Sequence, residues 1–367
     1  MNQSKNLCFH NITDVTKYLK SNFSKDMHFG DGEIGNIVKK MWDEKDVSQN
    51  DHTILSSILP LAINSSSLGD VTLKAGECLN LSDKFKDNGI INAEIDTLTM
   101  STGSSIVCKG KFLNLTINYL KKVDVQPSDS PSPNAGYDIG IFGNDGKKGY
   151  DGAEGTKGNS GVRGQNGQES SPGIVGPNPT PGTSGEQGGT GGNGGNGENG
   201  EKILATTITI KAMDKPITIY AKAGTGGNGG NGGKGGKGGK GGDGGDGISA
   251  GCEGQNGANG GNGGSGGIGG AGGTGGDGGD GGVIKVVVGA GLGNYVNTVT
   301  TESDGGNGGY GGAGGDGGDP GQGGAAGKHH DRGPDGNKGS NGASGPFGNK
   351  GKPGITAPTI NVVESLF

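Results

Sequence analysis

The sequence has few aromatic residues and no long apolar run. Aromatic residues make up 4% of the chain and apolar residues together 27%, which excludes a large apolar core over most of its length. No run of about 18 apolar residues occurs, so no transmembrane segment is predicted. The polar start, Met1–Asn6, lacks the apolar region of a signal peptide. We expect a protein made in the cytoplasm and released by lysis, phage assembly or a non-classical secretion route.

The sequence also has few cysteines and a small net charge. Cys8, Cys78, Cys108 and Cys252 are scattered without a CxxC pair, which predicts reduced, buried thiols rather than a zinc site or a disulfide framework. The net charge of -6 arises from 31 basic and 37 acidic residues mixed along the chain. This mixture argues against a nucleic-acid partner, and no cofactor is predicted.

Glycine divides the chain into two parts. Only 8 of the 91 glycines lie in the first 125 residues, where ordinary apolar content allows one small domain. The distribution predicts four regions. They are a β-rich attachment or interaction domain with short N-terminal helices (1–125), a linker (126–139), a glycine-rich bundle (140–354) with strand insertions at 203–222 and 283–300, and a C-terminal strand (355–367).

The glycines recur at every third position. From Gly140 to Gly200 only Ser170 and Pro179 depart from this register, and the same spacing returns in 224–247, 251–281 and 306–354. A left-handed extended helix has three residues per turn, whereas an α-helix would need 3.6. A side-chain-free edge lets the backbones of neighbouring segments pair, so we predict a bundle of about six polyglycine-II helices. A collagen-like trimer and a disordered linker are the alternatives.

Short β-branched segments interrupt the glycine runs. Residues 203–210 and 217–220 read as a hairpin, and 283–288, 295–299 and 360–363 as further strands. In the first part, 11–23 and 33–42 look helical, whereas 71–81, 90–100 and 106–117 alternate as strands. The fold class predicted is therefore an N-terminal α+β, β-rich domain (sheet or solenoid) followed by the helix bundle. A shared β-solenoid with glycine excursions is the rival architecture.

Two groups of charged side chains are candidate sites. The segment 241–249 matches a calcium-binding nonapeptide, which makes Asp243 and Asp246, and by analogy Asp277 and Asp280, weak calcium candidates. Three lysines at three-residue spacing form a ridge that suits an acidic glycan or phosphate surface, although a solvated ridge is the commoner case. They are Lys234, Lys237 and Lys240.

Four further residues complete the list of candidates. His329 and His330 invite a metal or pH-switch interpretation, although adjacent histidines at a repeat break are usually loop. Tyr295 and Tyr310 are candidate ligand contacts in the glycine-rich part. No Ser-His-Asp, paired-carboxylate or Cys-His constellation has suitable spacing. The sequence therefore predicts a protein that is not an enzyme.

The Gly-Gly-X runs at 226–246, 260–282 and 305–318 resemble the polyglycine-II helix bundles of springtail antifreeze proteins and of distal tail-fibre adhesins from T-even-like phages. In the adhesins, loops between glycine helices contact the receptor and a separate part attaches to the fibre. That resemblance implies a cell-surface receptor, glycan or protein, as partner, with 1–125 serving attachment to a homo-oligomer, fibre or virion.

The function expected is that of a non-enzymatic receptor-binding protein or adhesin whose rigid scaffold displays connecting loops. A self-assembling fibre or matrix subunit is the alternative, and a toxin component or an ice-binding protein is a further one. Ice binding would need a flat face of regularly spaced small residues, whereas the X positions here carry Lys, Asp, Asn and Tyr.

Overall fold

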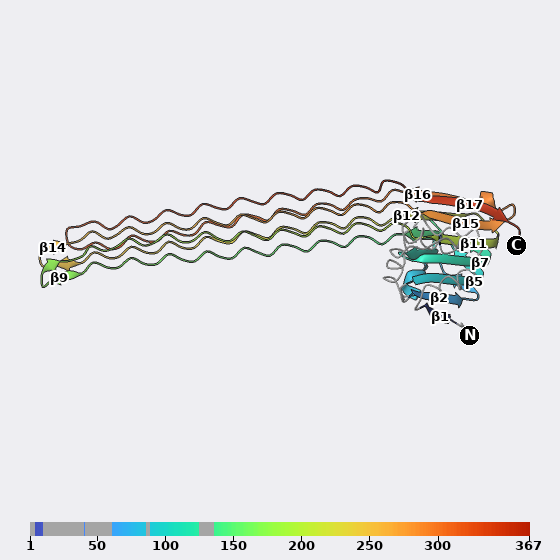
Figure 1. The fold of residues 1–367 in the computed structure, drawn as a ribbon, viewed down its shortest axis with the longest axis horizontal. Helices are drawn as coiled ribbons and strands as arrows, with labels where there is room; N and C mark the ends of the chain where they lie inside the picture. Colours follow the sequence, from blue (N-terminus) through green and yellow to red (C-terminus); the bar gives the residue numbers. More distant parts are fainter. Residues whose placement is uncertain (1–3, 10–39, 41–60, 86–88, 125–135) are drawn as a thin grey trace.

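The computed structural model describes residues 4–9, 40, 61–85, 89–124 and 136–367. Figure 1 shows two parts, a compact β-coil that carries both ends of the chain and a long stalk that ends in a tip. Within the described residues, no helix is long and apolar enough to span a membrane. The expected helices at 11–23 and 33–42 lie outside those residues, apart from residue 40.

One sheet of the coil has eight strands. Its strands are parallel except for β1, which pairs antiparallel with β2, and β3 pairs with part of β5. The strands are β1 (Ser4–Phe9), β2 (Leu61–Ser67), β3 (Val71–Leu73), β5 (Gly89–Ser101), β7 (Phe112–Val123), β11 (Thr206–Met213), β15 (Val283–Gly289) and β17 (Thr359–Ser365).

A second, five-stranded sheet is parallel throughout, and the chain alternates between the two sheets as in a solenoid. Its strands are β4 (Cys78–Asn80), β6 (Ser105–Lys109), β8 (Ile139–Phe142), β12 (Ile217–Lys222) and β16 (Val296–Thr301). The hairpin predicted at 203–220 is wrong, because β11 pairs with β7 and β15 whereas β12 pairs with β8 and β16. The Met213–Pro216 segment is a corner between sheets.

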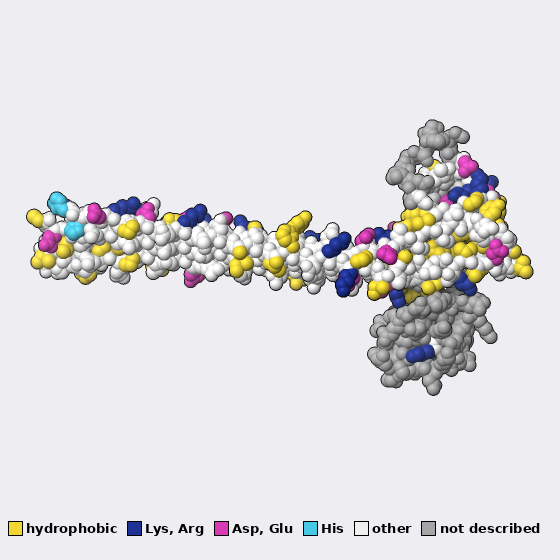
Figure 2. All heavy atoms as spheres, turned by 90° about the horizontal axis from the view of Figure 1, so that it is seen from above, with side chains coloured by type: hydrophobic (Ala, Val, Ile, Leu, Met, Phe, Trp, Pro, Cys, Tyr) yellow, Lys and Arg dark blue, Asp and Glu magenta, His cyan; other side chains and the backbone are white. Residues whose placement is uncertain are grey.

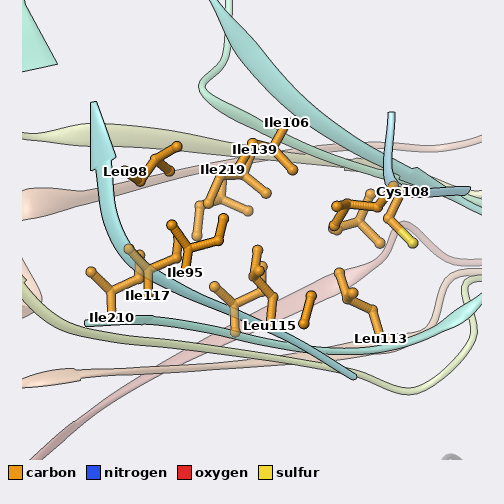
Figure 3. Close-up of a cluster of buried hydrophobic side chains, with 14 of the residues drawn as sticks. Ile95, Leu98, Ile106, Cys108, Leu113, Leu115, Ile117, Ile139, Ile210 and Ile219 are labelled. Carbon is orange, nitrogen blue, oxygen red and sulfur yellow. The ribbon is translucent and has the colours of Figure 1, made fainter. Parts of the chain in front are cut away.

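Alternating aliphatic side chains of both sheets meet inside the coil. Ile95, Ile117 and Ile210 come from neighbouring strands of the first sheet, and Ile139 and Ile219 from the second; all are fully buried (Figure 3). The period-two alternation of these strands explains the arrangement, since every second side chain of a strand points to the same face. This single core joins strands from both sides of residue 125.

Three glycine-rich excursions leave the coil at one corner and return to it. They begin after β8, β12 and β16 and end before β11, β15 and β17. Each consists of an outbound segment, a connector at the tip and a return segment. We call 143–167, 224–247 and 304–327 the outbound segments, and 182–201, 255–281 and 333–354 the return segments.

Backbone hydrogen bonds arrange these six segments in two layers. The outbound segments bond side by side, as where Gly229 N donates to Asn307 O at 2.8 Å. The return segments do the same, as where Gly194 N donates to Ala271 O at 2.9 Å. Bonds between the layers include Gly273 N to Gly230 O at 2.8 Å. The segments of a layer run in the same direction, and the two layers run in opposite directions.

Glycine is required where segments touch. A Cβ at Gly267 would overlap the carbonyl oxygen of Gly189 in the neighbouring segment, and one at Gly233 would overlap that of Ala153. Both glycines of a Gly-Gly-X triplet face neighbours in the middle of the stalk, whereas the X side chain points to solvent. The period of three thus marks the contact edges.

Asn and Asp side chains complete the hydrogen bonding at the surface. Asn262 Oδ1 accepts the N–H of Asn337 at 2.8 Å, and Asn231 Oδ1 accepts that of Tyr310 at 3.0 Å. These bonds join X positions of adjacent segments in one layer. They satisfy backbone donors that glycine contacts do not reach.

Side chains of the last return segment also close one edge of the stalk. Asn341 Oδ1 accepts the N–H of Gly317 at 3.0 Å, and Asp335 Oδ1 accepts that of Gly323 at 2.7 Å. Between these two positions the register places Pro320, which has no N–H, opposite Lys338, which cannot accept one. At this edge, side-chain oxygens of the last return segment therefore accept backbone N–H groups at Gly317 and Gly323.

The predicted fold class is wrong. The described residues form mostly parallel β-sheets, the helices with defined bounds are α4 (Leu81–Lys84) and the 3-10 turn η2 (Gly293–Tyr295), and no bundle of about six helices is present. The outbound and return segments contain neither helix nor strand and are extended excursions from the coil. Glycine spacing specifies lateral packing, but it does not reveal that β11, β15 and β17 complete the sheet of β5 and β7.

Candidate functional site

The three connectors between outbound and return segments meet at the tip, remote from both ends of the chain (Figure 1). The first forms β9 (Glu169–Ser171) and β10 (Ile174–Val175), and the second forms β13 (Ser249–Ala250) and β14 (Glu253–Gly254). Both are tight antiparallel turns with a glycine at positive φ, Gly173 at 79° and Gly251 at 60°. Glycine tolerates that conformation without strain.

Gln255 ties the first two connectors together. Its side chain is 3% exposed, and its Nε2 donates to Gly176 O at 2.9 Å and Pro177 O at 3.2 Å. Its backbone N–H donates to Ile248 O at 3.0 Å, and its carbonyl accepts from Gly327 of the third excursion at 2.8 Å. The side chain and backbone of Gln255 together therefore link all three excursions at the tip.

The third connector carries the two histidines predicted as a metal or pH-sensitive site. His329 has φ of 56°, a strained conformation for a residue with a side chain. His330 Nδ1 lies 3.1 Å from Asn256 Oδ1, and Lys328 N donates to Ser249 Oγ at 2.8 Å. Among the described residues no group of three His, Cys, Asp or Glu side chains could hold a metal.

The lysine ridge on the outbound layer is balanced by carboxylates. Lys237 lies 3.1 Å from Asp319 and Lys240 lies 3.2 Å from Asp243, whereas Lys234 is 3.6 Å from Asp316. These pairs are exposed and each contributes little to stability. Figure 2 shows most basic side chains of the tip half along one rim of the stalk. The ridge thus presents alternating charges rather than a positive surface.

The four calcium candidates serve the backbone instead. Asp243 Oδ1 accepts the N–H of Gln322 at 2.9 Å, and Asp246, Asp277 and Asp280 accept N–H groups of neighbouring segments in the same way. The hydrogen bond from Gln322, followed by the Lys240 ammonium, holds the pKa of Asp243 below its ordinary value. Asp277 and Asp280 belong to the return layer, so the structure does not gather the four.

The two tyrosines lie far apart. Tyr295 is in η2 at the coil, whereas Tyr310 is on the third outbound segment, where its ring packs edge-on against Phe347 with centroids 5.8 Å apart. Tyr310 and Phe347 are 69% and 72% exposed. The sequence singled out Tyr310 but not its pairing with Phe347, because the two residues lie on the outbound and return segments of the third excursion.

The cysteine thiols were expected to be buried, but their burial differs from one to the next. Cys108 is buried in the coil, and burial raises its pKa to about 11. Cys78 and Cys252 are exposed, the latter in the second connector at the tip. The expectation of buried thiols thus holds for one of these three.

Comparisons with known proteins give no family. No family model matches the chain, and no curated protein matches it. Among solved structures, the chain is similar to a springtail antifreeze protein from Granisotoma rainieri, described as a nine polyproline type II helical bundle whose crystal waters match the ice lattice. The match has 25% identity, covers 53% of this chain and 93% of that chain, and has a TM-score of 0.09.

So low a TM-score carries no argument about fold. The expected resemblance to polyglycine-II bundle proteins, whether antifreeze proteins or phage adhesins, is wrong for this chain, because its described residues are β-rich with very little helix. Its period-three spacing is a low-complexity pattern, and such a pattern does not reveal the parallel coil from which the glycine segments depart.

Proposed function

We propose that this protein is a non-enzymatic surface-binding protein in which a β-coil anchors a stalk, and the stalk presents three connectors to a receptor on a cell surface. The observation that carries the proposal is the convergence of all three connectors at the end of the stalk farthest from the coil (Figure 1). Binding residues commonly lie on loops positioned by a rigid scaffold.

The dimensions of the stalk support display at a distance. A period-three extended chain rises about 3.1 Å per residue, so a segment such as 224–247 spans roughly 70 Å. Six mutually bonded segments of this length hold the tip away from the coil without an apolar core. Such reach suits contact with a receptor beneath a surface layer of glycans.

The chemistry of the tip fits a glycan or a protein surface. Ile174 is 55% exposed, and the connectors also expose Glu169, Lys328 and Arg332. Charged hydrogen-bonding groups around an exposed apolar side chain are typical of recognition surfaces. The fixed backbone at Gln255 lowers the entropic cost of presenting them.

The test replaces the connectors and leaves the stalk segments unchanged. Residues 169–175, 249–253 and 328–332 are exchanged for Gly-Ser sequence of equal length, and Gln255 is retained. The proposal predicts that binding of labelled protein to receptor-bearing cells and to glycan arrays is lost, with circular dichroism unchanged. A matched control, Lys234→Gln with Lys237→Gln and Lys240→Gln, should bind as the parent does. Retained binding by the connector variant would refute the proposal.

A second candidate is a self-assembling structural subunit. One observation favours it: β17 is the terminal strand of its sheet in the described part of the chain, with Val363 43% exposed. Such an edge can pair with another chain. Concentration-dependent fibres seen by electron microscopy, lost on Val363→Lys substitution, would support this candidate over the first.

A further inference from the structure

The two layers of the stalk differ in charge. The X positions of the outbound layer include the lysine ridge and its aspartates. The return layer carries fifteen consecutive uncharged side chains in five rows across its three segments. These are Ser184, Gln187, Thr190, Asn193 and Asn196 on the first, Asn262, Ser265, Ile268, Ala271 and Thr274 on the second, and Asn337, Ser340, Ala343, Pro346 and Asn349 on the third.

Hydrogen bonds establish that these fifteen side chains share one face. Asn193 and Asn196 Oδ1 accept the N–H groups of Ala271 and Thr274 at 2.9 and 3.0 Å. On the other side, Ser340 Oγ lies 3.1 Å from Ser265 Oγ. The side chains are short, so the face follows the plane of the layer. The lysine ridge and its paired aspartates, whose charges argued against a flat binding face, belong to the opposite layer, and Asp277 and Asp280 lie beyond the five rows.

The face is organised like a protein interface. Its centre is apolar, with Ile268 48% exposed beside Ala271, Ala343 and Pro346. Ser, Thr and Asn surround that centre. An apolar centre without charges, inside a polar rim, is the composition that distinguishes interface cores from other surfaces.

We infer that the return layer is a self-association surface on which a second copy of this chain docks through the same face. Two uncharged, flat and identical faces fit each other without leaving a buried charge unpaired, which would be costly. A two-fold axis through the centre brings Ile268 and its apolar neighbours against their counterparts, as in isologous dimers. The outbound layer, with its charges, then remains in water on both copies.

The size of the face is adequate for a dimer. Five rows of three residues at about 3.1 Å per residue, across three segments about 4.8 Å apart, give roughly 45 Å by about 15 Å, or about 700 Å² per copy. Stable interfaces bury about 800 Å² per partner. The estimated area is therefore close to that of a stable interface, and buried area alone does not set the affinity.

The experiment is analytical ultracentrifugation of the full chain over a concentration series up to on the order of 100 μM. The parent should pass from monomer to dimer, whereas Ile268→Lys and Ala343→Lys, each placing a charge at the centre of the face, should weaken association at least about tenfold. Ala313→Lys adds the same charge to an exposed alanine of the outbound layer and should dimerise as the parent does.

Two results would overturn the inference. The first is a parent that stays monomeric throughout the series. The second is a dimer that all three variants form equally, which would place the contact on the coil or the tip. Circular dichroism melts of the variants, expected to match the parent because all three positions point to solvent, distinguish lost docking from lost folding.

Discussion

The coil and the stalk are stabilised by opposite means. The coil buries isoleucine, leucine and valine side chains between two sheets, and its backbone pairs strand with strand. The stalk buries backbone: its inner glycines donate to carbonyls of neighbouring segments at 2.7 to 3.0 Å, with side chains turned outward. The two parts should therefore tolerate different substitutions. Glycine should be essential in the stalk, and large apolar residues should be essential in the coil.

The largest effect should come from adding one methyl group inside the stalk. Gly267→Ala places a Cβ onto the carbonyl of Gly189, and rigid neighbours on all sides prevent relaxation. We expect a loss of about 4 kcal/mol or more in stability of the stalk. Hydrogen exchange of the stalk amides measures this loss of stability. The control Ser265→Ala, two residues earlier and outward-facing, should be nearly neutral; equal effects of the two would contradict the close packing.

Removing apolar volume should destabilise the coil instead. Leu115 is fully buried, so Leu115→Ala should cost about 3 kcal/mol in a denaturant titration followed by far-ultraviolet circular dichroism. Lys121→Ala, on the same strand and exposed, serves as the control. If Leu115→Ala lowered the free energy of unfolding no more than its control does, the apolar core would not stabilise the coil as described.

A smaller effect is expected from the Asn ladder. Asn262→Ala removes the acceptor for Asn337 N–H, which then depends on water. Because the site is exposed, we expect a loss of about 1 kcal/mol. Amide exchange at Asn337 is the direct measurement, and Asn262→Asp, which keeps an acceptor oxygen, should restore slow exchange. Fast exchange in the parent would show that the ladder is not formed.

The smallest effect should come from acid. Lys148 lowers the pKa of Asp151 below its ordinary 3.8, and Lys237 lowers that of Asp319 in the same way. A carboxyl with a depressed folded-state pKa stabilises the fold fully above its ordinary pKa, and that contribution is lost as the pH falls through the depressed value. The melting temperature of the stalk should therefore be flat above about pH 5 and fall modestly below about pH 4. Asp319→Asn should reduce the slope, and an unchanged slope would deny the pairing with Lys237.

The sequence allowed local features to be predicted better than global ones. Period-three glycine correctly located the contact edges, since a Cβ at Gly267 would overlap the carbonyl oxygen of Gly189. The alternating strands also exist, including β5 and β7. Each of these depends on neighbours in sequence, which a periodic pattern can specify.

Long-range pairing could not be predicted in the same way. The parallel register of β11 with β7 and β15 joins segments separated by whole excursions, and a period-two pattern fits a hairpin equally well. The charge difference between the layers could not be predicted for a related reason. Outbound and return segments alternate along the chain, so the X positions of one layer come from segments that are far apart in sequence. Hydrogen bonds between residues about 79 positions apart, such as Asn231 and Tyr310, show which segments share a layer.

The tip was predicted only in outline. Connecting loops were expected to carry function, but Gln255 gave no signal because it occupies an ordinary X position just after the second connector. Its importance follows from burial against Gly176 and Pro177, which come from the preceding excursion. The lysines and aspartates that the sequence did emphasise proved to pair with one another or with backbone donors.

The most direct test of the central claim, that backbone pairing between excursions holds the stalk together, is residue-resolved amide exchange by NMR. Gly266 and Gly267 donate to Ser340 O and Gly236 O, both at 2.8 Å, and should exchange slowly. Gly308, Gly311 and Gly314, for which the described residues provide no acceptor, should exchange fast on the same segment as slow Gly309 and Gly312. Uniformly fast exchange across 224–281 and 304–327 would contradict the account.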